Sequence, residues 1–400
     1  MKKCVICDRD LKKEEIRYLG KGVCRQCAFA ITGFYRGGEE KKRPDGSILT
    51  PQQLYDRISE YVVGQEKAKK VLCVAAYTHQ LRSCGAVSEN VGKSNVLLLG
   101  PTGSGKTYMV RMLARALGVP FVSVSAASLT ETGYEGESIG DTIKRLCLVA
   151  DGDIERAEKG IIFIDEIDKL CVRGTSPKTV GVTGVQQELL TVLEGTMVDT
   201  GSQFMTIGIR TEGNQRMLDT SKVLFICGGA FPDLGDIISA RLNTGGGIGF
   251  GSDRVGRGQV PEDILCRVRD EDLQKFGMIP ELIGRLPVKC ALRPLEIEEM
   301  KRILGKTRGS VVSQFTEIFS SFGVKFSVED AALGEIAQKA KQRGTGARAL
   351  RSVAEELFND LLFDVPERKE VVEIVITAAF VRGEEDVIII KKKKKARAGV

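Results

Sequence analysis

The feature that most constrains the fold of this 400-residue chain is the glycine-rich segment Gly100-Pro-Thr-Gly-Ser-Gly-Lys106-Thr107. It matches the pattern G-x-x-x-x-G-K-[ST] in full, follows the apolar run Asn95–Leu99 and opens the helical periodicity Thr107–Leu117. A strand that leads into such a turn lets backbone N–H groups converge on phosphate oxygens, and the following helix adds its positive N-terminal end. The segment predicts a nucleotide site in which Lys106 reaches the β- and γ-phosphates and Thr107 binds Mg²⁺.

A second apolar run ends in two carboxylates, Ile161-Ile-Phe-Ile-Asp165-Glu166. The carboxyl ends of strands are where open α/β sheets bind ligands. We expect Asp165 to hold Mg²⁺ directly or through water, and Glu166 to orient and deprotonate the attacking water. A strand that ends in solvated acids is common by itself, but its combination with the phosphate loop favours ATP hydrolysis. His79 is the only histidine, so a base for water activation must be a carboxylate.

Between residues 50 and 291, short apolar runs alternate with helical periodicities. The runs of strand length are Asn95–Leu99, Pro120–Val124, Ile161–Ile164 and Val223–Ile226. This alternation predicts an α/β domain whose parallel sheet has helices on both faces; a fifth strand is expected without a definite place. Thr50 as N-cap and Pro51 at the first helical position mark the start of its first helix.

Residues 292–390 have a mainly helical pattern and predict a second, smaller domain. Helices are expected at Ile297–Gly305, Ser310–Phe322 and Asp330–Lys341, followed by strand-like runs at Val371–Ile376 and Asp386–Ile390. Residues 391–400 form a basic tail that like-charge repulsion keeps solvated. A nucleic-acid arm is the alternative, but no aromatic residue interleaves the lysines.

Four of the eleven cysteines form two pairs, Cys4-x-x-Cys7 and Cys24-x-x-Cys27. This spacing is typical of a four-cysteine Zn²⁺ site. A domain of residues 1–36 is too small to fold on its own core, so the metal would supply its stability; residues 37–49 read as a linker. A redox dithiol is the rival interpretation, but it needs a thioredoxin-like βαβ setting that is missing. Zinc-ribbon binding of nucleic acid stays open.

The remaining composition indicates a soluble, cytoplasmic protein. No window approaches 18 consecutive apolar residues, and the N-terminus is polar, so neither a membrane span nor a secretory signal is expected. His79 lies on an amphipathic stretch, which favours a surface or core role over catalysis. The seven scattered cysteines have mostly apolar neighbours and are expected in the core: Cys73, Cys84, Cys147, Cys171, Cys227, Cys266 and Cys290.

Along nearly its whole length the chain resembles the ClpX family of AAA+ unfoldases. The resemblance is carried by three further segments: Tyr61-Val62-Val63-Gly64-Gln65, Ile279–Val288 and Gly344–Ser352. It implies that Val62 and Val63 contact the adenine, and that ATP is bound by Pro101, Thr102, Gly103, Ser104, Gly105, Lys106, Thr107 and Tyr108. It also implies a homo-hexameric ring and gives the zinc domain a role in dimerisation and in receiving substrates or adaptors.

Two arginines in these segments have the chemistry that phosphoryl transfer needs, since a guanidinium is a planar, permanently charged fork. By resemblance, Arg348 reaches back to the nucleotide of its own chain, and Arg285 acts on the ATP of the neighbouring subunit. An ordinary surface ion pair is the alternative for either residue. ATP held between two domains would change their angle on hydrolysis, and a ring would convert this change into motion.

Two glycine-flanked segments resemble the family's working loops. Tyr134, in Gly133-Tyr-Glu-Gly136, corresponds to the aromatic residue that pushes a threaded polypeptide through the pore. Ile248-Gly249-Phe250 is an apolar pair between glycines, poor as core material and suited to docking in a hydrophobic pocket. It matches the loop by which the family binds the ring peptidase ClpP. Either loop could instead be an ordinary surface turn.

The sequence departs from the family pattern at two places. Glu135 stands where the pore loop usually has a small aliphatic residue, and Met197–Leu218 lacks the usual basic cluster of the pore entrance. Recognition of acidic peptide termini is therefore expected to differ.

The sequence as a whole predicts an ATPase that acts as a protein unfoldase and translocase, a chaperone that feeds protein substrates to a ClpP-type peptidase ring. No peptidase activity of its own is expected, because the sequence shows no nucleophile paired with a base: serines are plentiful, but His79 is the only histidine. Two alternatives are a DNA-remodelling or loader ATPase and a stand-alone remodeller without a peptidase. Tyr134 and the Ile248–Phe250 loop argue against the first.

Overall fold

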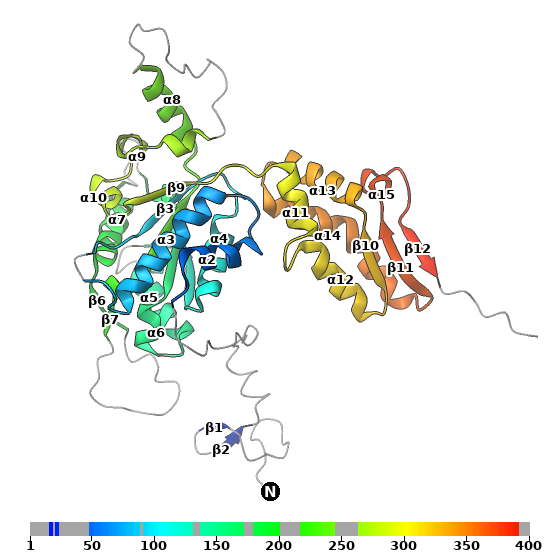
Figure 1. The fold of residues 1–400 in the computed structure, drawn as a ribbon, viewed down its shortest axis with the longest axis horizontal. Coiled ribbons are helices and arrows are strands. Elements are labelled where there is room, and N and C mark those ends of the chain that lie inside the picture. The colour runs from blue at the N-terminus through cyan, green and yellow to red at the C-terminus, as the bar shows by residue number, and fades with distance from the viewer. Residues whose placement is uncertain are drawn as a thin grey trace, which may run out of the picture.

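The structure, a computed structural model, describes residues 16–18, 21–23, 48–88, 91–130, 137–171, 179–200, 217–244 and 263–391. Its main feature is a five-stranded sheet in which every neighbouring pair of strands is parallel (Figure 1). The strand order is β4 (Phe121–Ser125), β5 (Ile161–Asp165), β8 (Leu224–Gly229), β3 (Val96–Leu99) and β9 (Val288–Ala291). The predicted α/β class with a parallel sheet is confirmed, and β9 is the fifth strand that had no definite place.

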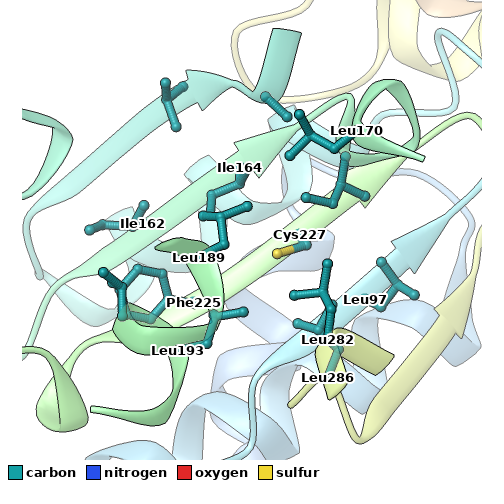
Figure 2. Close-up of a cluster of buried hydrophobic side chains, with 14 of the residues drawn as sticks. Leu97, Ile162, Ile164, Leu170, Leu189, Leu193, Phe225, Cys227, Leu282 and Leu286 are labelled. Carbon is teal, nitrogen blue, oxygen red and sulfur yellow. The ribbon is translucent and has the colours of Figure 1, made fainter. Parts of the chain in front are cut away.

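Helices cover both faces of this sheet because successive residues of each strand point to opposite sides. One face packs against α5 (Ile139–Val149), α7 (Thr179–Glu194) and α10 (Pro280–Gly284) through Leu97, Ile162, Ile164, Phe225 and Cys227 (Figure 2). The other face packs against α2 (Pro51–Ser59), α3 (Glu66–Ser83) and α4 (Lys106–Leu117) through Val96, Leu98, Ile161 and Phe163. All of these strand residues are buried, so the hydrophobic effect fixes the sheet between two helical layers.

The predicted helix boundaries in this part are close to the observed ones. At the start of α2, the Thr50 hydroxyl accepts a hydrogen bond from the backbone N–H of Gln53 at 3.3 Å. In return, the side-chain oxygen Oε1 of Gln53 accepts one from the backbone N–H of Thr50 at 3.0 Å. This reciprocal capping satisfies two backbone donors that a helix leaves free. At the C-terminal end of α4, Gly118 is left-handed with φ 70° and closes the helix.

Shorter elements connect this framework. They are η1 (Ala126–Ser128), α6 (Ile154–Glu158), η2 (Ile167–Leu170), η4 (Thr220–Lys222), α8 (Leu234–Thr244), η5 (Ile264–Arg267), α9 (Asp270–Phe276) and the antiparallel pair β6 (Met197–Asp199) and β7 (Met217–Asp219). Near the N-terminus, β1 (Ile16–Tyr18) pairs antiparallel with β2 (Lys21–Val23).

A second group of elements follows β9 and lies beside the sheet-bearing part (Figure 1). It contains α11 (Ile297–Gly305), α12 (Val311–Ser321), α13 (Asp330–Gln342), α14 (Ala347–Asp364), η6 (Val365–Glu367) and α15 (Ala378–Arg382). These helices share a core of their own with the three-stranded sheet β10 (Lys325–Val328), β11 (Val371–Ile376) and β12 (Ile388–Lys391). The mainly helical C-terminal part is confirmed.

The sequence pattern missed some details here. Ser310 is the N-cap of α12, its hydroxyl accepting from Ser313 N–H at 3.2 Å, rather than part of the helix. The last strand begins at Ile388 instead of Asp386. β10 was not predicted, because its four residues form too short a run to give a clear period.

The scattered cysteines are not all in the core. Cys73, Cys147, Cys227 and Cys290 are buried, and burial raises the pKa of each thiol. Cys84 and Cys266 are exposed, so the prediction of a core position is wrong for these two. In the described ranges, no helix combines the length and the apolar character that crossing a bilayer requires.

Candidate active site

A cavity of about 800 Å³ lies between the carboxyl edge of the main sheet and the C-terminal group of helices. The phosphate loop and the start of α4 contribute one wall, Thr102–Tyr108. The last residue of β5 and the residues after β5 and β8 contribute a second wall, Asp165, Glu166 and Ala230. Helices α11, α12 and α14 contribute the third. The cavity thus lies where the sheet-bearing part meets the C-terminal group.

The phosphate loop lies between a strand and a helix, as the sequence predicts. β3 delivers the chain to the turn, and α4 begins at Lys106 with the left-handed Gly105 (φ 93°) as its N-cap. Lys106 Nζ donates to the carbonyl oxygens of Gly100 at 2.6 Å and Pro101 at 3.1 Å. Burial lowers the pKa of Lys106, while the carboxylates of Asp165 and Asp168 oppose that shift. Pro101 is the one predicted loop residue that does not line the cavity.

Thr107 and Asp165, the two residues expected at magnesium, are in direct contact. The Thr107 hydroxyl donates to Asp165 Oδ2 at 2.6 Å. Hard oxygen donors of this kind suit Mg²⁺, which takes few protein ligands and fills its octahedron with waters and phosphate oxygens. No cluster of three or more His, Cys, Asp or Glu side chains capable of holding a metal occurs among the described residues, and a nucleotide-bound magnesium does not need one.

Glu166 has an unusual backbone conformation for a glutamate. Its φ of 58° is left-handed, which costs about 1–2 kcal/mol for a residue with a Cβ. The carboxylate Oε2 accepts from the Ser125 hydroxyl at 2.7 Å. Ser125 ends the neighbouring strand β4, where it pairs in register with Asp165. Strand pairing therefore places a hydroxyl donor beside the predicted base.

Asp168 is a third carboxylate of the site, which the sequence reasoning did not single out. It lies in η2, lines the cavity, and accepts from the Ala230 N–H at 3.1 Å through Oδ1. This bond ties the turn after β5 to the turn after β8. The signal available in the sequence was its position three residues after Asp165, just beyond the end of the predicted strand.

Several lining residues of the cavity are apolar, of the kind against which a nucleotide base packs. Val62 and Val63, predicted from the segment before α3, are two of them. Tyr61 lines the cavity from the same segment, and Leu295, Ile303 and Val311 line it from the C-terminal group. The last three follow no local motif, so only the folded chain brings them to the site.

Arg348 also lines the cavity, from the second position of α14. Arg351, one turn further along, lines it as well and pairs with Glu355 at 2.7 Å. The N-terminus of α14 touches the phosphate loop directly, because Ala347 N–H donates to the carbonyl oxygen of Gly103 at 3.1 Å. Two arginines of the C-terminal part thus line the same cavity as the phosphate loop.

Arg285 is not part of this cavity. It is the C-cap residue of α10, and its side chain is 52% exposed. Its guanidinium pairs with the Glu194 carboxylate, with Nη2 at 2.6 Å and Nε at 2.9 Å from Oε1. An exposed position away from the chain's own site is compatible with action on a neighbour and equally with a surface ion pair.

Several predicted site residues lie outside the described residues. They are Cys4, Cys7, Cys24 and Cys27 of the predicted zinc site, Tyr134 of the predicted pore loop, and Ile248, Gly249 and Phe250 of the predicted docking loop. Glu135 and residues 201–216 lie outside as well, as do residues 392–400 of the basic tail.

Comparison with known proteins gives matches to both parts of the chain. A family model described as AAA domain (Cdc48 subfamily) matches residues 92–289, and one described as C-terminal, D2-small domain, of ClpB protein matches residues 295–378. The chain is similar to the ATP-dependent Clp protease ATP-binding subunit ClpX of Treponema denticola, with 41% identity over 93% of this chain and 92% of that protein. It is similar to the protein of the same description from Borrelia duttonii, with 38% identity over 94% of this chain and 89% of that protein.

Proposed function

The chain belongs to the family of ClpX, the ATP-binding subunit of the ATP-dependent Clp protease, and on that premise we propose that it is an ATP-driven unfoldase and translocase that delivers proteins to a ClpP-type peptidase. The observation that supports the ATPase chemistry is the contact between Thr107 and Asp165 at 2.6 Å, beside Lys106 and Glu166 in one cavity. The peptidase belongs to the partner, and the cytoplasm is the proposed location.

The residues of the cavity have distinct roles in this proposal. Lys106 binds the β- and γ-phosphates, and Thr107 with Asp165 holds Mg²⁺, which when bound neutralises charge on those phosphates. Glu166 accepts a proton from the attacking water and orients it. Arg348 offers a fixed positive charge to the γ-phosphate from the C-terminal part.

ATP bound in this cavity would contact both parts of the chain, and this links hydrolysis to movement. The phosphate loop belongs to the sheet-bearing part, whereas Arg348, Ile303 and Val311 belong to the C-terminal group. Loss of the γ-phosphate removes interactions that hold the two together, so the angle between them changes. We place the boundary between the two domains at residues 291 and 292.

Arg285 completes the proposal at the subunit boundary. Its guanidinium is exposed and does not line the cavity of its own chain, so it would stabilise the transition state on the adjacent subunit of a homo-hexameric ring. Tyr134 would grip the polypeptide in the central channel, and Ile248 and Phe250 would dock in pockets on the peptidase ring.

The N-terminal residues would form a separate zinc module in this proposal. Cys4, Cys7, Cys24 and Cys27 provide four thiolates, the donor set of a closed structural site. Metal analysis should find one Zn²⁺ per chain in the purified protein, and none once Cys4 and Cys24 are both changed to serine. This module is the proposed contact for adaptors and for incoming substrates.

The test of the function is degradation of a folded, tagged reporter by the purified protein, with ATP, in the presence and absence of ClpP. We expect unfolding that needs ATP alone and degradation that needs both ATP and ClpP. Deletion of residues 247–251 should leave ATPase and unfolding intact and abolish degradation. A reporter that stays folded, together with an ATPase that duplex DNA stimulates in a salt-sensitive manner, would favour a DNA-remodelling ATPase instead.

A further inference from the structure

Asn95 is a buried amide at the amino end of β3, with 2% of its surface exposed. Its side-chain Nδ2 donates to two backbone carbonyl oxygens, that of Arg285 at 3.2 Å and that of Leu193 at 3.4 Å. Both neighbours can only accept, so the NH₂ side of the amide must face them. One side chain therefore joins two segments that are distant in sequence.

The two segments that Asn95 joins also carry the two residues of one ion pair, Glu194 and Arg285. Leu193 directly precedes Glu194, the last residue of α7, and Glu194 pairs with the Arg285 guanidinium at 2.6 Å. The segments are thus connected twice, inside the protein by the Asn95 amide and at the surface by the ion pair. An exposed ion pair contributes little by itself, whereas a buried donor with two carbonyl partners fixes the backbone underneath it.

Neighbouring polar groups hold the end of α7 in the same place. Lys93 Nζ donates to the carbonyl oxygens of Leu193 at 3.3 Å and Thr220 at 2.8 Å, and it lies 4.6 Å from the centroid of the Phe225 ring. The Thr220 hydroxyl donates to the Val192 carbonyl oxygen at 3.0 Å. The last turn of α7 is therefore anchored to the sheet, and Asn95 extends this anchor to Arg285.

This polar cluster is separate from the nucleotide cavity of the same chain. Asn95 and the phosphate loop lie at opposite ends of β3, about 13 Å apart for four residues of strand. Neither Asn95, Leu193 nor Arg285 lines the cavity. A change at Asn95 that leaves the fold intact can reach nucleotide chemistry only through what it holds.

We propose that Asn95 is a positioning residue for Arg285, fixing the backbone from which that guanidinium reaches the nucleotide of the adjacent subunit. This inference rests on the proposed action of Arg285 on a neighbour. A transition-state contact is sensitive to placement, and a shift of 1 Å can cost about 10²-fold in rate. Asn95 would thus control hydrolysis in a site that it does not touch and that belongs to another chain.

The first measurement compares ATP binding and hydrolysis in Asn95→Leu and Asn95→Asp. Leucine is close in size and cannot donate, and aspartate sets a carboxylate against two carbonyl oxygens. We expect kcat to fall about 10²-fold while the Kd for ATP stays within about twofold of the wild type. If both variants lose ATP binding along with hydrolysis, Asn95 serves the fold of its own chain and the proposal is overturned.

The decisive measurement mixes subunits. Glu166→Gln subunits have an inactive site but an intact Arg285, whereas Asn95→Leu subunits have an intact site and a misplaced Arg285. Mixed assemblies should hydrolyse ATP well above the sum of the separate preparations, because each Asn95→Leu site beside a Glu166→Gln neighbour receives a correctly held arginine.

The reference mixture is Arg285→Ala with Glu166→Gln. Recovery in the reference without recovery in the Asn95→Leu mixture would overturn the positioning role and leave the proposed function standing. If the reference mixture recovers no ATP hydrolysis, Arg285 does not act on the neighbouring subunit, and the role proposed for Asn95 is refuted as well.

Discussion

Ser125 Oγ donates to Glu166 Oε2 at 2.7 Å, across the pairing of β4 with β5. The backbone of Glu166 is left-handed (φ 58°), and its side chain reaches Ser125 at the end of β4. The hydrogen bond from Ser125 then holds the carboxylate of the proposed base at that position. A hydroxyl that holds a general base at one position does not react itself, but it selects the direction from which water can be activated.

Ser125→Ala is expected to lower kcat for ATP hydrolysis about tenfold, which corresponds to about 1.4 kcal/mol in the barrier and lies near the lower end for a hydrogen bond to a charged group. ATP affinity should stay unchanged, because the Ser125 hydroxyl bonds to Glu166 and Ser125 does not line the cavity. Steady-state kinetics and direct measurement of the Kd separate the two effects.

The matched controls are Ser125→Thr, which keeps a hydroxyl, and Ser128→Ala. Ser128 lies in the same turn, and its hydroxyl donates to the Ser125 carbonyl oxygen at 2.8 Å without contacting Glu166. Both controls should retain most of the wild-type kcat. Equal loss in Ser128→Ala would mean that the turn, and not the bond to Glu166, matters.

Glu166→Gln should bind ATP and hydrolyse it 10²- to 10⁴-fold more slowly, the range expected on losing a general base. The amide keeps the size of the side chain and removes its basicity, while Lys106, Thr107 and Asp165 remain in place. Single-turnover hydrolysis measured on preloaded nucleotide gives the chemical rate without the binding step. Brisk turnover would exclude Glu166 from the role of base.

The sequence was sufficient for those parts of the site that depend on local patterns. The phosphate loop needs a strand, a turn and a helix in succession, and Asp165 needs only the end of a buried strand. Both lie at the carboxyl edge because all parallel strands end there. Thr107 and Asp165 could therefore be expected near one another, and their contact at 2.6 Å agrees with that expectation.

Other parts of the site depend on pairings that no local pattern contains. Ser125 meets Glu166 because β4 is next to β5, and Asp168 meets Ala230 because β8 is on the other side of β5. Strand order is decided by the packing of the whole sheet. Leu295 likewise reaches the cavity only through the docking of a second core, so its sequence neighbourhood carries no sign of the nucleotide.

Gly346→Ala should separate the wall of the cavity formed by the phosphate loop from the wall that includes α14. Gly346 has a φ of 59°, and a Cβ at this position would lie 2.6 Å from the carbonyl oxygen of Gly103 in the phosphate loop. That contact is too short, so α14 and Arg348 must move away. A displacement of about 1 Å predicts a loss of about 10²-fold in kcat/KM. Thermal unfolding should also show a destabilisation of about 1–3 kcal/mol, because a Cβ fits poorly at φ 59° and ψ −139°.

Gly344→Ala is the matched control for this change. Gly344 lies in the same loop with a φ of 70°, yet a Cβ there would meet no atom within 4 Å. An alanine there also has a positive φ, with a strain of about 1–2 kcal/mol, but it meets no clash. Activity close to wild type in Gly344→Ala, with loss in Gly346→Ala, would assign the effect to the contact; equal loss in both would assign it to strain.

His79 predicts a pH dependence of stability, because it is the only histidine of the chain and is buried in α3 with 5% exposure. Burial, with smaller effects from Lys93 and Arg82, lowers its pKa from 6.5 to about 3. Below pH 6.5 the unfolded chain therefore binds a proton that the folded chain excludes. The free energy of unfolding should fall as the pH drops from 6.5 toward 3, by up to about 1.4 kcal/mol per pH unit.

The measurement is denaturant unfolding of the wild type and of His79→Leu between pH 7.5 and 5, where most carboxylates stay ionised. Lys93, whose pKa burial lowers to about 7, gives a slope of the same sign above pH 7 in both proteins, because there too the unfolded chain binds the extra proton. The difference between the two proteins should be constant above pH 7 and should grow in favour of His79→Leu below pH 6.5. Parallel curves over the whole range would mean that the imidazole can take up its proton inside the fold.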